Sequence, residues 1–191
     1  MANAKKLMMA SAGSGGGDFL SDVVSDNNLI EGNFSGTYLG SSVPQGSIRA
    51  VQCMGCHILS DGTMIGVYDE RFRNAPYIIK YDTDGTALAW KTVTNTTQGG
   101  IDFRVYHSTV DSSDNLYLAG EVEGYNVAGF GGLSKEGVIK IDTSGNMSLT
   151  KYWVYPHDDE NDNGGTSKLY GCSINKNNGN LMVCGIATTA V

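Results

Sequence analysis

The residues best suited to do chemistry are two cysteines and a histidine in AVQCMGCHI, residues 50–58. Cys53-x-x-Cys56-His57 has the spacing by which c-type haem is attached. The flanking residues, however, are those of a β-strand, in which residues three apart point to opposite faces with α-carbons about 10 Å apart. A disulfide needs less than about 7 Å. We therefore expect Cys53 and Cys56 to be reduced thiols, buried as small strand residues, with a haem or a shared zinc ion as the alternatives.

Two Asp-Thr-x-Gly segments, which begin at Asp82 and Asp142, have the sequence of the active-site triplet of aspartic proteases. Each lies between two apolar runs, where Asp can bond its own backbone and Gly can adopt a positive φ. We expect these aspartates to cap the backbone of hairpin turns and not to share a catalytic proton. Because no Ser-His-Asp order, phosphate loop or activated cysteine stands out either, we predict that the protein is not an enzyme.

The most polar stretch is HDDENDNGG, residues 157–165. Asp159-x-Asn161-x-Asn163-Gly fits the first half of a calcium loop, because hard cations need several oxygen ligands brought together by a tight turn. The bidentate acid expected at position 12 is missing, since Tyr170 stands there. A solvated loop is the simpler interpretation, and Asp159, Asn161 and Asn163 are the candidate ligands for calcium. We expect no other cofactor.

Aromatic side chains beside the variable loops are further candidates for ligand contact. Trp153 and Tyr155 stand next to the acidic loop, and Tyr125 and Phe130 belong to the loop 121–136. Tyr and Trp suit the recognition of sugars or proteins, and packing in the core is the competing interpretation.

The elements that must position these residues repeat along the chain. YIIKYDTDGTALAWKTV (77–93) matches GVIKIDTSGNMSLTKYW (137–153) without gaps, and upstream of them Asp61 corresponds to Asp114. Each unit reads as four strands joined by turns, with a period of 53–60 residues. That period is typical of a β-propeller blade of about 40–50 residues with longer loops. INKNNGNLMVCGI (174–186) begins the pattern a third time.

The repeat assigns the cysteines to recurring strand positions. Three strands align, VQCMGCHI, FRVYHSTV and SKLYGCSI, which begin at residues 51, 103 and 167. The alignment sets Cys56 opposite Ser108 and Cys172, and His57 opposite Thr109. Since the histidines do not fall at equivalent positions, we expect no ring of histidine ligands.

The pattern divides the chain into three parts. Residues 1–17 form a glycine-rich arm, residues 18–47 a connecting or wrapping segment, and residues 48–191 the repeats. The predicted fold class is all-β: repeated four-stranded antiparallel blades of a partial β-propeller, two complete and part of a third, preceded by an extended N-terminal arm. An open set of blades exposes edge strands. We therefore expect the chain to continue until the propeller closes, or its sheets to close against other subunits.

The arm and the residues just after it contain the apolar side chains Leu7, Met8, Met9 and Phe19 in an otherwise polar, flexible leader. The arm can bury too little surface to fold alone, and its glycines raise the entropy cost of ordering it. Apolar residues in such a leader are useful when they insert into a groove on a partner. We therefore expect these four residues to bind other subunits of a large assembly.

The chain of 191 residues has 13 basic and 20 acidic residues, for a net charge of -7. An acidic surface repels a phosphate backbone, so we expect no nucleic-acid partner. No run approaches the roughly 18 apolar residues of a membrane span. The apolar stretch after Lys5-Lys6 is shorter than the roughly 7–15 residues of a signal peptide, so we expect synthesis inside the cell.

The repeat resembles the bacterial and phage β-propeller repeat family, whose pattern is close to K-Y-D-x-x-G-x-x-x-W followed by D-S-x-G-N-x-Y-x-x-G. The matching residues are Lys80-Tyr81-Asp82, Gly85 and Trp90 in the first half, and Asp111-Ser112-Ser113, Asn115, Tyr117 and Gly120 in the second. The resemblance covers residues 48–191 and implies the propeller fold. It supplies no catalytic or cofactor-binding residue.

The leader KKLMMASAG resembles those of predicted virion proteins of marine tailed phages. Together the two resemblances imply a virion structural protein, made in the host cytoplasm, such as a tail fibre, a tail-associated protein or a decoration protein. Its arm would bind other virion proteins, and a homo-oligomeric β-repeat domain would project toward a host-surface glycan or protein. A secreted or cell-surface bacterial adhesin is the alternative, and a cysteine-dependent haem or metal protein is a further one.

Overall fold

The structure is a computed structural model of the chain, and it describes residues 8–11, 30–33, 39–40, 51–70, 76–93, 101–124, 134–154 and 167–187. Within these ranges every regular element is a β-strand and there is no helix, as the sequence predicts. It follows that no described helix could cross a membrane. The candidate calcium ligands Asp159, Asn161 and Asn163, and the arm residues Leu7 and Phe19, lie outside the described residues.

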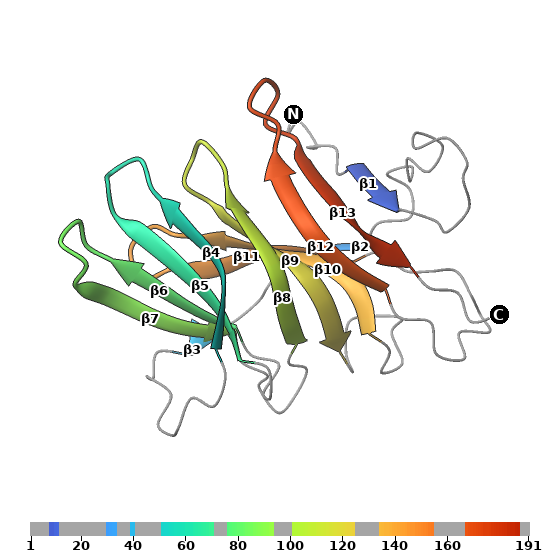
Figure 1. The fold of residues 1–191 in the computed structure, drawn as a ribbon, viewed down its shortest axis with the longest axis horizontal. Coiled ribbons are helices and arrows are strands. Elements are labelled where there is room, and N and C mark those ends of the chain that lie inside the picture. Colours follow the sequence, from blue (N-terminus) through green and yellow to red (C-terminus); the bar gives the residue numbers. More distant parts are fainter. Residues whose placement is uncertain are drawn as a thin grey trace.

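Two four-stranded antiparallel units and one hairpin make up the body of the protein (Figure 1). The first sheet contains β4 (Val51–Ile58), β5 (Met64–Glu70), β6 (Tyr77–Tyr81) and β7 (Ala87–Val93). The second sheet contains β8 (Ile101–Val110), β9 (Leu116–Gly124), β10 (Ser134–Asp142) and β11 (Ser148–Val154). The third sheet contains β12 (Ser167–Ile174) and β13 (Leu181–Ala187). In each sheet consecutive strands are neighbours, which is the order that the repeat predicts.

The N-terminal segment adds one short strand to the edge of each sheet. β1 (Met8–Ser11) pairs in parallel with β13, β2 (Ile30–Asn33) pairs with β11, and β3 (Leu39–Gly40) pairs with β7. Residues 30–33 and 39–40 thus form short strands within the predicted connecting or wrapping segment. Met8 and Met9 lie in β1 and pair with Met182 and Val183 of their own chain, whereas the predicted contact with other subunits stays a prediction.

The sheets pack face to face in chain order, with the second sheet in the middle. We call the face of a sheet that is turned toward the next sheet along the chain its trailing face, and the other its leading face. Along β9 the side chains alternate between the two interfaces: Leu116 and Leu118 contact the first sheet, and Tyr117 and Ala119 contact the third. Burying each large apolar side chain contributes about 1.5–3 kcal/mol, so these two layers hold the sheets together.

Two clusters of buried residues fill the interfaces. The cluster between the first and second sheets includes Ile65, Val67, Ile78, Phe103, Val105, Leu118, Ile139 and Ile141. The cluster between the second and third sheets includes Tyr117, Ala119, Val138, Leu169, Cys172, Leu181 and Val183.

Each sheet has the same irregularity in its first strand. The pairing skips one residue between Cys53 and Gly55, between Val105 and His107, and between Leu169 and Gly171. The extra residues Met54, Tyr106 and Tyr170 therefore occupy one recurring β-bulge. This recurrence confirms the alignment of the three strands.

The bulge shows that the prediction for Cys53 and Cys56 was wrong in two respects. Cys53 pairs with Tyr68 and Cys56 with Gly66, which are two residues apart on β5 and so share one face. Met54 shifts the alternation by one position, so that both thiols lie on the leading face of the first sheet. Both are free, as expected, but they are exposed instead of buried.

The two Asp-Thr-x-Gly segments form hairpin turns, but the turns differ. In the first sheet the Gly85 amide donates to the Asp82 carbonyl at 3.0 Å, whereas in the second sheet the Met147 amide donates to the Ser144 carbonyl at 3.0 Å. The second turn lies two residues further along, and Met147 takes a positive φ of 58°. The gapless match of the two sequences therefore ends at the turn.

The first hairpins of the first and second sheets are equally long, which corrects the alignment of their turns. Gly62 corresponds to Asp114, and Asp61 does not. Both Gly62 and Asp114 have positive φ, at 86° and 61°, a conformation that Asp tolerates better than most residues. The Asp114 carboxylate accepts the amide and hydroxyl hydrogens of Ser60, and so links the two hairpin turns.

Candidate functional site

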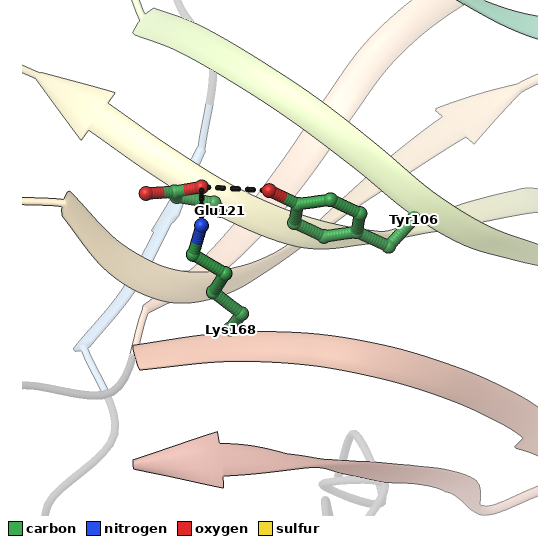
Figure 2. A network of polar contacts seen from close by, with 3 residues as sticks. All are labelled: Tyr106, Glu121 and Lys168. Atoms are coloured by element: carbon green, nitrogen blue, oxygen red, sulfur yellow. Dashed lines mark hydrogen bonds and ion pairs between the residues drawn. The ribbon is translucent and has the colours of Figure 1, made fainter. Parts of the chain in front are cut away.

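The candidate site is a polar cluster of Tyr106, Glu121 and Lys168 between the second and third sheets. Tyr106 is the bulge residue of β8, Glu121 lies on β9, and Lys168 lies on β12. Figure 2 shows the tyrosine hydroxyl and the lysine ammonium converging on one oxygen of the glutamate. Because the bulge takes Tyr106 out of the regular alternation, its ring can reach the third sheet, where it lies 5.2 Å from the ring of Tyr170.

The contacts within the cluster are short and mostly shielded from water. The Tyr106 hydroxyl donates to Oε2 of Glu121 at 2.8 Å, and Nζ of Lys168 lies 3.3 Å from the same oxygen. The ammonium also lies 5.8 Å from the Tyr106 ring centroid, which is within cation–π range. The Glu121 side chain is 5% exposed. A buried carboxylate is thus stabilised by a hydroxyl of its own sheet and a cation of the next.

The electrostatics of the cluster argue against proton transfer or nucleophilic attack. Burial raises the pKa of Tyr106, and its hydrogen bond to Glu121 raises it further. Burial would lower the pKa of Lys168, but the attraction of Glu121 outweighs it, and the pKa lies above its ordinary value. Groups that hold their protons this firmly are poor bases and nucleophiles at neutral pH. The arrangement is suited to fixing one sheet against the next.

Replacing Lys168 by methionine should test this linking role. Lys168→Met keeps an unbranched apolar chain and removes the cation beside a buried carboxylate, so we expect a loss of about 1–2 kcal/mol in the free energy of unfolding. Urea denaturation of the two proteins measures the loss. In a Glu121→Gln background the same substitution should cost much less, because the amide needs no cation. An unchanged unfolding midpoint in the single variant would contradict the role.

Two histidines also link consecutive sheets. Nε2 of His57 lies 2.8 Å from Oγ of Ser108, whose hydroxyl donates to the Met54 carbonyl at 3.4 Å. The Cys172 amide donates to Nδ1 of His107 at 3.3 Å. Ser108 and Cys172 occupy the same position of the repeat, so both imidazoles contact the next sheet at one recurring place.

The three residues of the haem-type motif do not converge. His57 pairs with Ile65, a residue of the core between the first and second sheets, whereas Cys53 and Cys56 lie on the outer, leading face. Burial lowers the pKa of His57, and the charge of His107 lowers it further. Among the described residues no three His, Cys, Asp or Glu side chains are grouped so that they could hold a metal ion.

The surroundings of Cys172 and of the capping aspartates suit a structural role. Burial raises the pKa of Cys172 to about 12, and Cys184 adds to the shift. The thiol of Cys172 is therefore unreactive. Asp82 accepts the Thr83 amide at 2.6 Å and Asp142 accepts the Ser144 amide at 2.8 Å, which confirms the predicted capping of hairpin turns.

Trp153 packs in the core, the alternative that the sequence left open. It contacts the cluster between the second and third sheets, and its ring stacks on Tyr117 with centroids 6.3 Å apart. The other aromatic candidates, Tyr125, Phe130 and Tyr155, lie outside the described residues.

Comparison with known proteins finds no protein-family model and no solved structure that matches this chain. The site is therefore interpreted from its own geometry.

The sequence does hold one signal of the cluster that motif searching missed. In the register of the repeats, Lys168 corresponds to Arg104 and Glu121 corresponds to Asp69. A base on the first strand of one unit and an acid on the second strand of the unit before it thus recur together. Opposite charges at recurring positions of neighbouring units are what a link between consecutive sheets requires.

Proposed function

We propose that this protein is a structural component of a tailed-phage particle, a tail fibre, tail-associated protein or decoration protein that displays a β-propeller-type domain to the host surface. One observation carries the proposal: polar side chains that could do chemistry are used to join sheets. The Tyr106–Glu121–Lys168 cluster joins the second and third sheets, and the His57–Ser108 and Ser60–Asp114 contacts join the first and second. A rigid repeated stack suits display and binding.

The sheets are best understood as successive blades of a propeller. Each begins with the same bulged hairpin, and the first two continue as four-stranded antiparallel meanders. In Figure 1 the three sheets stand side by side, and the turns of the hairpins β4–β5, β8–β9 and β12–β13 lie along one edge. The bonds between Ser60 and Asp114 agree with that arrangement. Such blades carry their ligand-binding surfaces on the loops that connect the strands.

The N-terminal arm supports an anchoring role. β1 is a strand of four residues, and it pairs with β13 in parallel. Parallel pairing is slightly weaker per residue than antiparallel pairing, and so short a strand can leave its edge at little cost. In this proposal residues Leu7, Met8, Met9 and Phe19 bind neighbouring virion proteins, and the repeat domain extends away from them.

Deleting residues 1–17 tests the anchor. We expect phage that carry the deletion to incorporate the protein at no more than about a tenth of the normal copy number, because the apolar arm residues supply the attachment. Quantitative mass spectrometry of purified particles measures the copy number. Circular dichroism of the isolated truncated protein should still show a β-rich fold.

A full-length variant with serine at Leu7, Met8 and Met9 is the matched control for chain length, and it should lose incorporation in the same way. Normal copy number of the truncated protein would contradict the anchor. Absence of the unaltered protein from purified particles would contradict the virion role itself.

A further inference from the structure

The two ends of the sheet stack expose strand positions that are buried or half-buried in the other sheets. On the leading face of the first sheet Cys53 and Cys56 are exposed, and Ile58 is 72% exposed. The corresponding residues are buried in, or packed against, a core in the other sheets: Val105, Ser108 and Val110 in the second, and Leu169, Cys172 and Ile174 in the third.

The trailing face of the third sheet shows the complementary pattern. Met182 is 47% exposed, Ile186 is 38% exposed, and Cys184 is exposed as well. The corresponding residues are buried in the other sheets: Ile65, Val67 and Asp69 in the first, and Tyr117, Ala119 and Glu121 in the second. Each end of the stack thus has the layout of one half of a sheet-to-sheet interface.

We infer that a second copy of this chain covers both faces, so that the leading face of each first sheet packs on the trailing face of the partner's third sheet. The inference rests on the blade arrangement proposed above and is independent of the virion role. It continues an interface that the chain already forms twice, between its first and second and between its second and third sheets.

At the positions of the inner ion pair, the two ends of the stack carry uncharged residues. At the positions that carry Glu121 and Lys168 in the inner interface, the exposed ends carry Ile186 and Gln52. An acid or a base at only one of these positions would be buried without its partner, which is costly. Because both are uncharged, these two positions bring no unpaired charge into the junction.

The edge of the third sheet is compatible with a second copy stacked on its face. In the first two sheets the second strand, β5 or β9, pairs with the third strand, β6 or β10. In the third sheet β1 occupies that edge of β13. A second copy that stacks on the trailing face of the third sheet contacts its side chains and leaves this edge undisturbed.

The number of sheets indicates how the assembly closes. A head-to-tail contact makes a ring if its rotation closes and a filament if it does not. The described residues form three sheets, so that those of two copies make six, within the roughly four to eight blades of a closed propeller, whereas those of three copies would exceed that range. We therefore expect a two-fold symmetric pair with two identical junctions.

Light scattering on the full chain tests the pair directly. The expected mass is twice the 20.3 kDa of one chain. Alkylation by iodoacetamide gives a second readout, because the junctions would cover Cys53, Cys56 and Cys184, which are exposed in a single chain. We expect these thiols to react about tenfold more slowly in the pair than in a dissociated variant.

Two variants dissociate the pair from opposite faces, and a third is the control. Ile186→Lys and Ile58→Lys should each give single chains with three fast-reacting thiols and an unchanged circular dichroism spectrum. Ser112→Lys adds the same charge to an exposed turn of the middle sheet, and should leave the pair intact. A monomeric wild-type protein with fast-reacting thiols would overturn the inference. So would a mass above two chains, or a pair that survives both face variants.

Discussion

Gly120→Ala is expected to destabilise the protein by at least about 3 kcal/mol, which is a large part of the roughly 5–15 kcal/mol that keeps a domain folded. Gly120 pairs with Val105 directly beside the bulge of β8. A β-carbon added at Gly120 would lie 1.8 Å from the backbone oxygen of Arg104. Since a backbone atom of the neighbouring strand cannot rotate away, the strands β8 and β9 would have to separate. Thermal and urea unfolding monitored by circular dichroism would measure the loss.

Two further glycines show whether the close approach is the cause. Gly185 occupies the same position in the third sheet, with a β-carbon position 2.0 Å from the Lys168 backbone oxygen, so Gly185→Ala should be costly as well. Gly145 lies in a turn with φ of 52° and nothing within 4 Å of its β-carbon position. Asn tolerates this conformation, so Gly145→Asn should cost less than about 1 kcal/mol. Equal losses in all three variants would contradict the explanation.

The sequence predicts features of this fold that depend on local chemistry. Asp82 and Asp142 cap turns because a short carboxylate bonds the next amides whatever surrounds it. The alternation along β9 is likewise local, since adjacent strand residues must face opposite sides. These local rules, repeated along the chain, account for the all-β fold and the order of its strands.

The bulges, which depend on the register between paired strands, were not predicted. Met54, Tyr106 and Tyr170 are ordinary strand residues, so nothing in their type reveals a bulge, and one undetected bulge was enough to place Cys53 and Cys56 on the wrong faces. The signal was indirect, in Gly120 and Gly185, which stand opposite the bulge in two of the three sheets.

The candidate site likewise depends on contacts between strands that are far apart in the sequence. Neither Glu121 nor Lys168 belongs to a recognisable motif, and they are brought together only because two sheets stack with a fixed offset. The charges at Arg104 and Asp69, one repeat earlier, make the pattern visible once the register is known.

The last prediction concerns Asp111, whose side chain holds the first hairpin of the second sheet together. One carboxylate oxygen accepts the amides of Ser113 and Asn115 at 2.9 and 3.0 Å, and the other accepts the buried hydroxyl of Tyr117 at 2.9 Å. Asp111→Ala would leave these donors without this acceptor, so we expect a loss of about 3 kcal/mol in the free energy of unfolding. Asp111→Asn keeps an acceptor oxygen and should cost less.

The pH dependence of stability separates this network from a general packing defect. Burial alone would raise the pKa of Asp111, but its hydrogen bonds from Asn115, Ser113 and Tyr117 outweigh it and hold the pKa below its ordinary value. A lowered pKa in the folded state means that the contribution is complete above about pH 4, and is lost as the pH falls through the folded-state pKa. The difference in stability between the wild-type protein and Asp111→Asn should therefore shrink in acid.

The exposed turn of Asp61 supplies the control for that experiment. Asp61 also accepts an amide and a hydroxyl hydrogen, both from Thr63, but it does so at the surface, where water can replace either bond. Asp61→Ala should therefore lower stability far less than Asp111→Ala does. If both variants lost the same stability, burial of the network could not be its source of strength. If the loss in Asp111→Asn did not change with pH, the charge of Asp111 would be irrelevant to it.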